Sequence, residues 1–140
     1  MLTPSPFYFA HILLATKSWE PTITKQLEIA IKGRLERNLE IRNSQLIVAG
    51  GGPEHIHLLG KITSTQPLYR ILGWSKGECS HWLNKNNPEL NFYWQKGYWH
   101  ENVDEDELDV VKNYILTQKD LHKSLSFTEE MAEMRSRGIL

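Results

Sequence analysis

The sequence predicts an α+β fold of the ferredoxin-like, split βαβ type: an antiparallel sheet, helices on one of its faces, and an additional C-terminal helix. Two observations support this fold class. The predicted elements follow the order β-α-β-β-α-β and then a helix, and the length of 140 residues suits one domain. We therefore take residues 1–140 as a single domain, in which about residues 125–140 form a C-terminal extension.

The chain opens with a predicted strand and a predicted helix. Residues 7–16 are rich in aromatic and aliphatic side chains, which is typical of a strand. A helix is expected near residues 22–38, because apolar side chains recur there at every fourth position. These side chains are Ile23, Leu27, Ile31 and Leu35.

Two further strands and a turn are expected next. Residues 44–49 form the second predicted strand, and the third strand ends near Ile62. Between them, the run Gly50-Gly51-Gly52-Pro53 is typical of a turn. No helix follows this run directly, so a loop between strands is favoured over a phosphate-binding loop.

The second half of the chain continues the pattern. A helix is expected over residues 67–84, and the aromatic segment 92–103 is expected to be extended and bent at Gly97. The third helix is expected over about residues 104–123. Asp104 and Glu107 have the spacing of a capping box, and the nearby acidic residues suit the positive end of a helix dipole.

Composition limits the class of protein without choosing a function. Forty per cent hydrophobic and 24% charged residues are ordinary for a globular domain. The net charge is −1, but six of the 17 acidic residues lie between residues 101 and 109, so the remainder carries about +5 and allows a basic face. The apolar run at residues 7–15 is too short to cross a membrane. Cys79 is the single cysteine, which favours a cytoplasmic protein.

The third predicted strand carries two histidines, His55 and His57, one residue apart. Side chains of a strand alternate between faces, so both imidazoles project from one face while Ile56 and Leu58 project from the other. Neutral imidazole is the commonest metal ligand, so a shared metal ion is the simplest common task. The alternative is a pair of exposed histidines on a half-buried sheet. Glu54 is adjacent, but we expect its side chain to point away from His55.

The third predicted helix adds a tyrosine and a glutamine. Tyr114 and Gln118 are four residues apart and therefore share one helix face, and His122 continues the same stripe. Gln118 offers a neutral oxygen as a third metal ligand, and Tyr114 offers a nucleophile one turn away. A lone tyrosine on a helix usually packs without any chemical role. Only the combination of Tyr114 and Gln118 with the histidine pair therefore indicates a site.

These residues resemble the single-tyrosine HUH transposases of small insertion sequences, and especially their relatives associated with repetitive extragenic palindromes (REP). The resemblance covers nearly the whole chain, with its motifs in order. They are Pro53-Glu54-His55-Ile56-His57-Leu58-Leu59, Lys76-Gly77-Glu78-Cys79-Ser80-His81-Trp82, Phe92-Tyr93-Trp94-Gln95-Lys96-Gly97-Tyr98 and Tyr114-Ile115-Leu116-Thr117-Gln118.

The resemblance implies a metal-dependent DNA transposase, that is, a single-strand endonuclease and strand transferase. It implies that Tyr114 is the catalytic residue, which forms a covalent 5′-phosphotyrosine with DNA. It implies that His55, His57 and Gln118 bind a divalent metal ion, Mg²⁺ or Mn²⁺, and it implies no other cofactor.

The same resemblance implies single-stranded or hairpin DNA as the substrate and a homodimer in which the tyrosine acts in cis or in trans. Arg70, Lys76 and Lys96 are the residues that we expect to contact DNA phosphates. The chain departs from the family after Tyr98, where it continues Trp99-His100-Glu101-Asn102. This departure affects the expected DNA target, but no proposed catalytic position.

Two alternatives to an active transposase remain open at this stage. A domesticated relative would recognise DNA hairpins without moving DNA, although such a binder has no need of Tyr114, His55, His57 and Gln118 together. An unrelated metalloenzyme, for example one that uses zinc at the histidine pair, would leave the spacing of Tyr114 and Gln118 unexplained.

Overall fold

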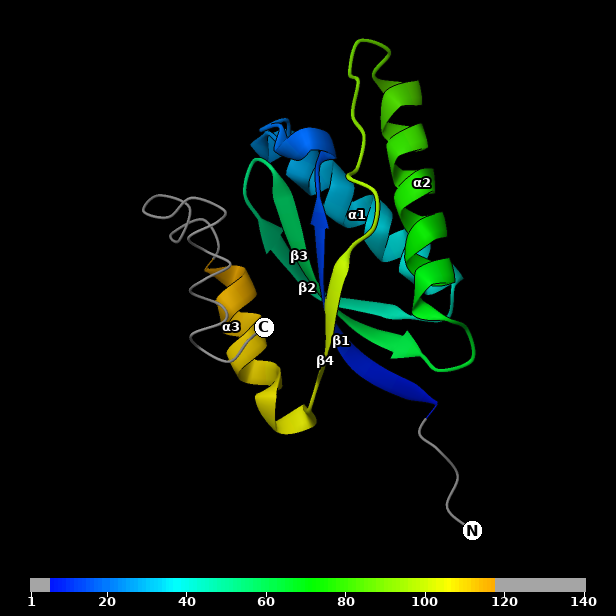
Figure 1. Cartoon of the computed structure of the whole chain (residues 1–140), viewed down its shortest axis with the longest axis vertical. Helices are drawn as coiled ribbons and strands as arrows, with labels where there is room; N and C mark the ends of the chain where they lie inside the picture. The colour runs from blue at the N-terminus through cyan, green and yellow to red at the C-terminus, as the bar shows by residue number, and fades with distance from the viewer. Residues whose placement is uncertain (1–5, 118–140) are drawn as a thin grey trace.

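The computed structural model describes residues 6–117, which form one four-stranded antiparallel sheet with the strand order β2-β3-β1-β4 and three helices (Figure 1). The strands are β1 (Phe7–Ala15), β2 (Gln45–Gly51), β3 (His55–Thr63) and β4 (Trp99–Val103). The helices are α1 (Lys25–Ile41), α2 (Leu68–Asn86) and α3 (Leu108–Leu116), with short 3₁₀ turns at Lys17–Trp19 and Glu105–Glu107. The predicted split βαβ fold is confirmed.

Helices α1 and α2 cover one face of the sheet, and α3 lies against the other (Figure 1). Alternation along β1 and β3 produces these two faces. The face toward α1 and α2 forms the main hydrophobic core. It receives Ala10, Ile12 and Leu14 from β1 and Ile56, Leu58 and Ile62 from β3, all nearly inaccessible to solvent.

Helix α1 begins later than the periodicity predicts. Thr24 is its N-cap, and the Thr24 hydroxyl accepts a hydrogen bond from the Leu27 amide at 3.1 Å. Such a cap satisfies one of the amide groups that the first turn leaves without a helical partner. Ile31 and Leu35 then face the core, as the four-residue spacing predicts.

An ion pair joins the two helices on this side of the sheet. The Arg34 guanidinium of α1 donates two hydrogen bonds to the Glu78 carboxylate of α2, one of them at 2.7 Å. The buried Asn38 amide donates to the same carboxylate at 2.9 Å. These hydrogen bonds, Arg34 first, hold the pKa of Glu78 below its ordinary value.

The glycine run is divided between a strand and a turn, whereas the sequence predicts a turn for all of it. Gly50 and Gly51 belong to β2 itself, and the turn that reaches β3 is confined to the three residues 52–54. A Cβ atom on Gly50 would lie 2.5 Å from the Ile115 carbonyl oxygen of α3. The missing side chain therefore allows α3 to approach β2 closely.

The capping box predicted before α3 is wrong. The Asp104 side chain makes no capping hydrogen bond, because Glu105–Glu107 form a 3₁₀ turn there. That turn is closed by the backbone, with the Glu107 amide donating to the Asp104 carbonyl at 2.9 Å. Helix α3 starts after it, at Leu108, and ends at Leu116 with Thr117 as its C-cap, so it is shorter at both ends than the predicted helix 104–123. Residues 118–123 and the predicted extension 125–140 lie outside the described residues.

Within residues 6–117, no helix has the length and apolar character to cross a bilayer.

Substitution of Gly50 by alanine tests the contact between α3 and β2. We expect Gly50→Ala to lower the free energy of unfolding by roughly 1–3 kcal/mol, because the new methyl group meets backbone rather than a movable side chain. The matched control is Gly33→Ala in α1, where a Cβ atom meets nothing within 4 Å and alanine favours the helix. Urea unfolding measures both. Equal stability of Gly50→Ala and the wild type would contradict this account.

The ion pair between α1 and α2 predicts a pH-dependent stability. The folded-state pKa of Glu78 is lowered, so its stabilising contribution is present above the unfolded-state pKa and is lost as the pH falls through the folded-state pKa. At neutral pH we expect Glu78→Gln to cost about 1–2 kcal/mol. At about pH 3 the difference from the wild type should shrink. Urea unfolding at both pH values measures it, with the exposed Glu36→Gln of α1 as the control. A pH-independent difference would contradict the prediction.

Candidate active site

Strand β3 presents His55 and His57 on the sheet face opposite α1 and α2. Their ring centroids are 5.0 Å apart, and neither side chain is exposed. Ile56 and Leu58 project into the main core, as alternation predicts. The two imidazoles are therefore neighbours on one face, buried rather than solvated, and the alternative of two exposed histidines does not describe this chain.

A carboxylate orients the first of these rings. Glu54 Oε1 lies 3.0 Å from His55 Nδ1, so the expectation that Glu54 points away from His55 is wrong. The reason is that Glu54 precedes β3 and lies in the turn, where strand alternation does not apply. The Glu54 carbonyl accepts hydrogen bonds from the Thr16 amide at 2.9 Å and from the Thr16 hydroxyl at 3.1 Å, which hold the turn against the end of β1.

A third histidine, which sequence reasoning left without a role in the site, orients the second ring. His11 of β1 is 1% exposed, and its Nε2 lies 2.9 Å from His57 Nδ1. His11 also makes an edge contact with Trp99 of β4, with 5.3 Å between ring centroids. Only the pairing register of β1 with β3 and β4 brings these residues together, and no local sequence signal reports that register.

Helix α3 places Tyr114 beside the histidines of the same chain. The Tyr114 ring centroid lies 5.5 Å from that of His57, nearly perpendicular to it, and 6.3 Å from that of His11. Tyr114 is 4% exposed and belongs to a small apolar cluster with Leu59 and Ile115. The structure thus brings three of the four predicted site residues together. The fourth, Gln118, lies outside the described residues, as does His122.

An acidic cluster lies at the start of α3. Within residues 6–117, Asp104, Asp106 and Glu107 are the three His, Cys, Asp or Glu side chains whose ligand atoms lie within 4.8 Å of one another. All three are exposed, and carboxylates at this end of a helix are stabilised by the helix dipole. The cluster therefore has a sufficient structural explanation.

The predicted DNA-binding residues are dispersed over the molecule. Arg70 is exposed at the start of α2, on the helical side of the sheet. The Lys76 ammonium of α2 donates to the backbone carbonyls of Gln95, at 3.0 Å, and Gly97, and burial lowers its pKa. Lys96 is exposed and lines a hollow on the histidine face. Lys96 is thus the member of the set that lies close to the candidate site.

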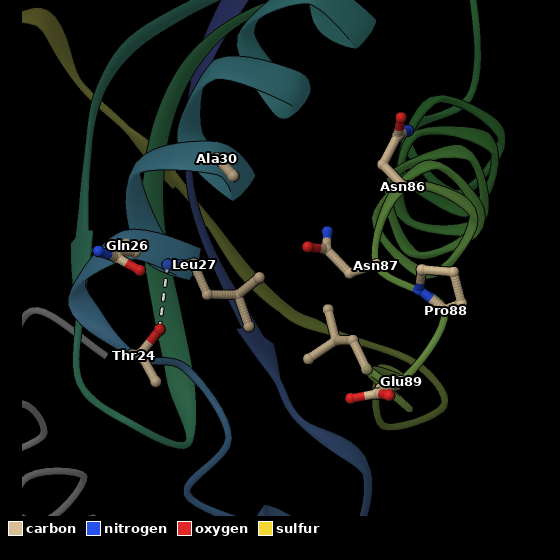
Figure 2. Close-up of a pocket in the computed structure, with 9 residues that line it drawn as sticks. Thr24, Gln26, Leu27, Ala30, Asn86, Asn87, Pro88 and Glu89 are labelled. Atoms are coloured by element: carbon tan, nitrogen blue, oxygen red, sulfur yellow. Dashed lines mark hydrogen bonds between the residues drawn. The ribbon is translucent and has the colours of Figure 1, made fainter.

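A cavity of about 710 Å³ lies elsewhere, between the start of α1 and the end of α2 (Figure 2). Figure 2 shows Thr24 and Leu27 on one side of it and Asn87 and Pro88 on the other. None of the histidines within residues 6–117 lines it. This cavity belongs to the helical side of the sheet and not to the candidate active site.

Comparison with known proteins identifies the family. The profile of the family described as "Transposase IS200 like" matches residues 7–118. A protein of Deinococcus radiodurans R1, provisionally identified as a transposase, superposes with a TM-score of 0.66 at 19% identity, over 84% of this chain and 98% of its own. A REP-associated tyrosine transposase bound to a REP hairpin superposes with a TM-score of 0.64 at 14% identity, over 89% of this chain and 76% of its own. The curated proteins include no significant match.

Proposed function

Because this chain belongs to the IS200-like transposase family, we propose that it cleaves and rejoins single-stranded DNA through a covalent bond between Tyr114 and a 5′-phosphate. One observation carries the proposal: the Tyr114 ring lies 5.5 Å from the ring of His57, whose neighbour His55 shares the same face. The proposed nucleophile and the two proposed metal ligands, from distant parts of the chain, are thus neighbours.

The histidine pair suits a divalent metal ion, and the family resemblance favours Mg²⁺ or Mn²⁺. A metal-bound histidine typically uses its other ring nitrogen in a hydrogen bond that fixes the tautomer. Here both Nδ1 atoms have such a bond, His55 with Glu54 and His57 with His11. We therefore assign Nε2 of His55 and of His57 as ligands, with Gln118 as the third. When bound, the metal polarises the scissile phosphate and stabilises the charge that develops during the reaction.

In the proposed reaction, Tyr114 supplies the nucleophile. Its phenolic oxygen loses its proton and bonds to phosphorus, while the bond between phosphorus and the 3′-oxygen breaks. The 3′-oxygen takes up a proton and leaves as a hydroxyl. Rejoining reverses this exchange, because a 3′-hydroxyl attacks the phosphotyrosine and releases Tyr114. The covalent link conserves the energy of the phosphodiester, so ATP is not required.

Access to Tyr114 requires movement. A side chain that is 4% exposed does not meet a DNA phosphate without rearrangement. Helix α3 has nine residues and, among the strands, packs mainly against β2 and β3, so we propose that it is the element that shifts when DNA binds. This shift would expose the hydroxyl while the histidines remain fixed on the sheet.

We propose hairpin DNA with an adjoining single strand as the substrate. The family and the fold shared with a REP-associated transposase support this choice. Arg70, Lys76 and Lys96 remain our predicted phosphate contacts, with Lys96 favoured because it lies on the histidine face. We also propose that the protein forms a homodimer and that it is located in the cytoplasm. The distance between His57 and Tyr114 of one chain favours catalysis in cis within it.

A second candidate function is hairpin binding without cleavage. The burial of Tyr114 favours it, because a pure binder has no need of an accessible nucleophile. The two candidates differ in one observable, the covalent bond to DNA.

Formation of a covalent adduct tests the proposed chemistry. Incubation with hairpin DNA that carries single-stranded flanks and Mn²⁺ should yield a protein–DNA adduct that survives denaturing electrophoresis. The adduct should disappear in Tyr114→Phe, which lacks the nucleophile, and persist in the control Tyr69→Phe, an exposed tyrosine of α2. Binding of DNA without an adduct in the wild type would favour the second candidate.

Metal affinity tests the ligand assignment separately from activity. We expect Glu54→Ala to weaken Mn²⁺ binding by about 10- to 100-fold, because His55 loses the carboxylate that orients it, and Glu54→Gln to recover part of the loss. His57→Ala should weaken it further. Titration calorimetry without DNA measures each affinity. Asp106→Asn in the acidic cluster is the control, and loss of binding in this variant alone would place the metal there instead.

A further inference from the structure

A hollow of about 250 Å³ adjoins the histidines on the same face of the sheet. Leu13 and Ala15 of β1 form its floor, and the register of the sheet places Leu13 opposite His57 and Ala15 opposite His55. Directly opposed side chains on one face of an antiparallel pair lie about 4.5–5.5 Å apart at Cβ. The hollow therefore lies beside the candidate active site, on the neighbouring strand.

Two tryptophans border this hollow. Trp99 of β4 lines it and contacts the His11 ring edge-on at a centroid distance of 5.3 Å. Trp19, which follows β1, lines it as well and is 48% exposed. A large aromatic side chain that remains half exposed beside a polar site is a typical platform for stacking a flat ligand.

A bulge in the pairing of β1 with β4 forms the rim. Leu13 pairs with Trp99 and Thr16 with Trp94, so the second strand has two more residues than the first in this interval. The extra residues include Gly97, which has a φ of 83°, a conformation that favours glycine. The Lys76 ammonium holds the bulge by its hydrogen bonds to the carbonyls of Gln95 and Gly97. Bulges of this kind are common next to active sites, where they redirect side chains.

The backbone that carries Trp19 is strained. Ser18 and Trp19 have φ values of 55° and 57°, a left-handed conformation that non-glycine residues rarely adopt. The Ser18 amide donates to the Gln95 side-chain oxygen at 2.9 Å, which ties this turn to the bulge. Such strain persists only where the surrounding structure imposes it, and it concentrates at ligand-binding sites.

We propose that this hollow, here called the base pocket, binds one unpaired nucleobase of the single strand next to the scissile phosphate. The inference rests on the proposed function and adds where the strand is held. Trp19 supplies a stacking surface, and the exposed Lys96 on the rim supplies a positive charge for the adjoining phosphate. The volume is below the roughly 300–1,000 Å³ of sites for drug-sized ligands and suits one flat ring system.

Lysine charges in and near the base pocket favour a nucleic-acid strand over a peptide. Lys17, in the same turn as Trp19, lies with its ammonium 5.9 Å from the centre of the exposed Tyr93 ring. Lys96 lines the base pocket together with Trp19, while Lys17 and Tyr93 form a second pair of a cation and an aromatic ring, in a neighbouring hollow. Alternation of cations and aromatic rings is the pattern by which proteins track a single strand.

The test measures DNA binding without metal, in EDTA, so that cleavage does not occur. The probe is a fluorescein-labelled DNA hairpin with single-stranded flanks, and the same stem with blunt ends is the comparison. We expect Trp19→Ala to weaken binding of the flanked hairpin by roughly 5- to 100-fold and to leave the blunt stem unchanged. Trp19→Phe should recover part of the affinity. Tyr69→Ala, an exposed aromatic residue of α2, is the matched control and should have no effect.

A second arm uses the wild-type protein and altered DNA, so that it does not depend on the folding of any variant. An abasic site is moved through the flank one nucleotide at a time. At one position, the abasic site should weaken DNA binding by the wild type by the same factor as Trp19→Ala does. The same abasic site should not weaken DNA binding by Trp19→Ala any further. Equal binding at every abasic position, an unaffected Trp19→Ala, or no binding of the single strand would overturn the base pocket. A Trp19-dependent position without any covalent adduct in Mn²⁺ would instead retain the pocket and reject the proposed chemistry.

Discussion

The structure depends on the burial of imidazole rings on one face of an antiparallel sheet. A buried polar group costs several kcal/mol unless it is hydrogen-bonded, so the surroundings of such rings must provide partners. Glu54 provides one for His55, and His11 provides one for His57. The turn before β3 and the register of β1 with β3 are the features that put those partners in place. The hydrogen bonds of the buried histidines therefore require this strand register and this turn, and in return they stabilise both.

The two faces of the sheet have different roles: one carries the main hydrophobic core and the other carries the candidate active site. One face carries the main core, in which aliphatic side chains of β1 and β3 pack against α1 and α2. The other face carries the histidines, the short helix α3 and the base pocket. The absence of a side chain at Gly50 allows α3 to lie close enough for Tyr114 to reach His57. The sheet therefore holds the metal-ligand candidates, while a short helix packed against it holds the candidate nucleophile.

Much of this arrangement was predictable because it depends on local patterns. The order of strands and helices follows from periodicities of two and of nearly four residues. The shared face of His55 and His57 follows from the same alternation. Predictions failed where a residue lies at the boundary of an element. Glu54 lies in a turn, so strand alternation does not govern it, and Asp104 precedes a 3₁₀ turn whose backbone bond replaces the expected cap.

The sequence by itself determined the family, the split βαβ fold, and which residues are candidates for the chemistry, because motifs and periodicity are properties of neighbouring residues. Only the tertiary structure decided that His11 supports His57, that Tyr114 is buried beside them, and that Trp19 and Trp99 border a hollow on the same face. These contacts join residues far apart in the chain. They depend on strand register and on the bulge opposite β1, which are set by the packing of the whole sheet and not by any local pattern.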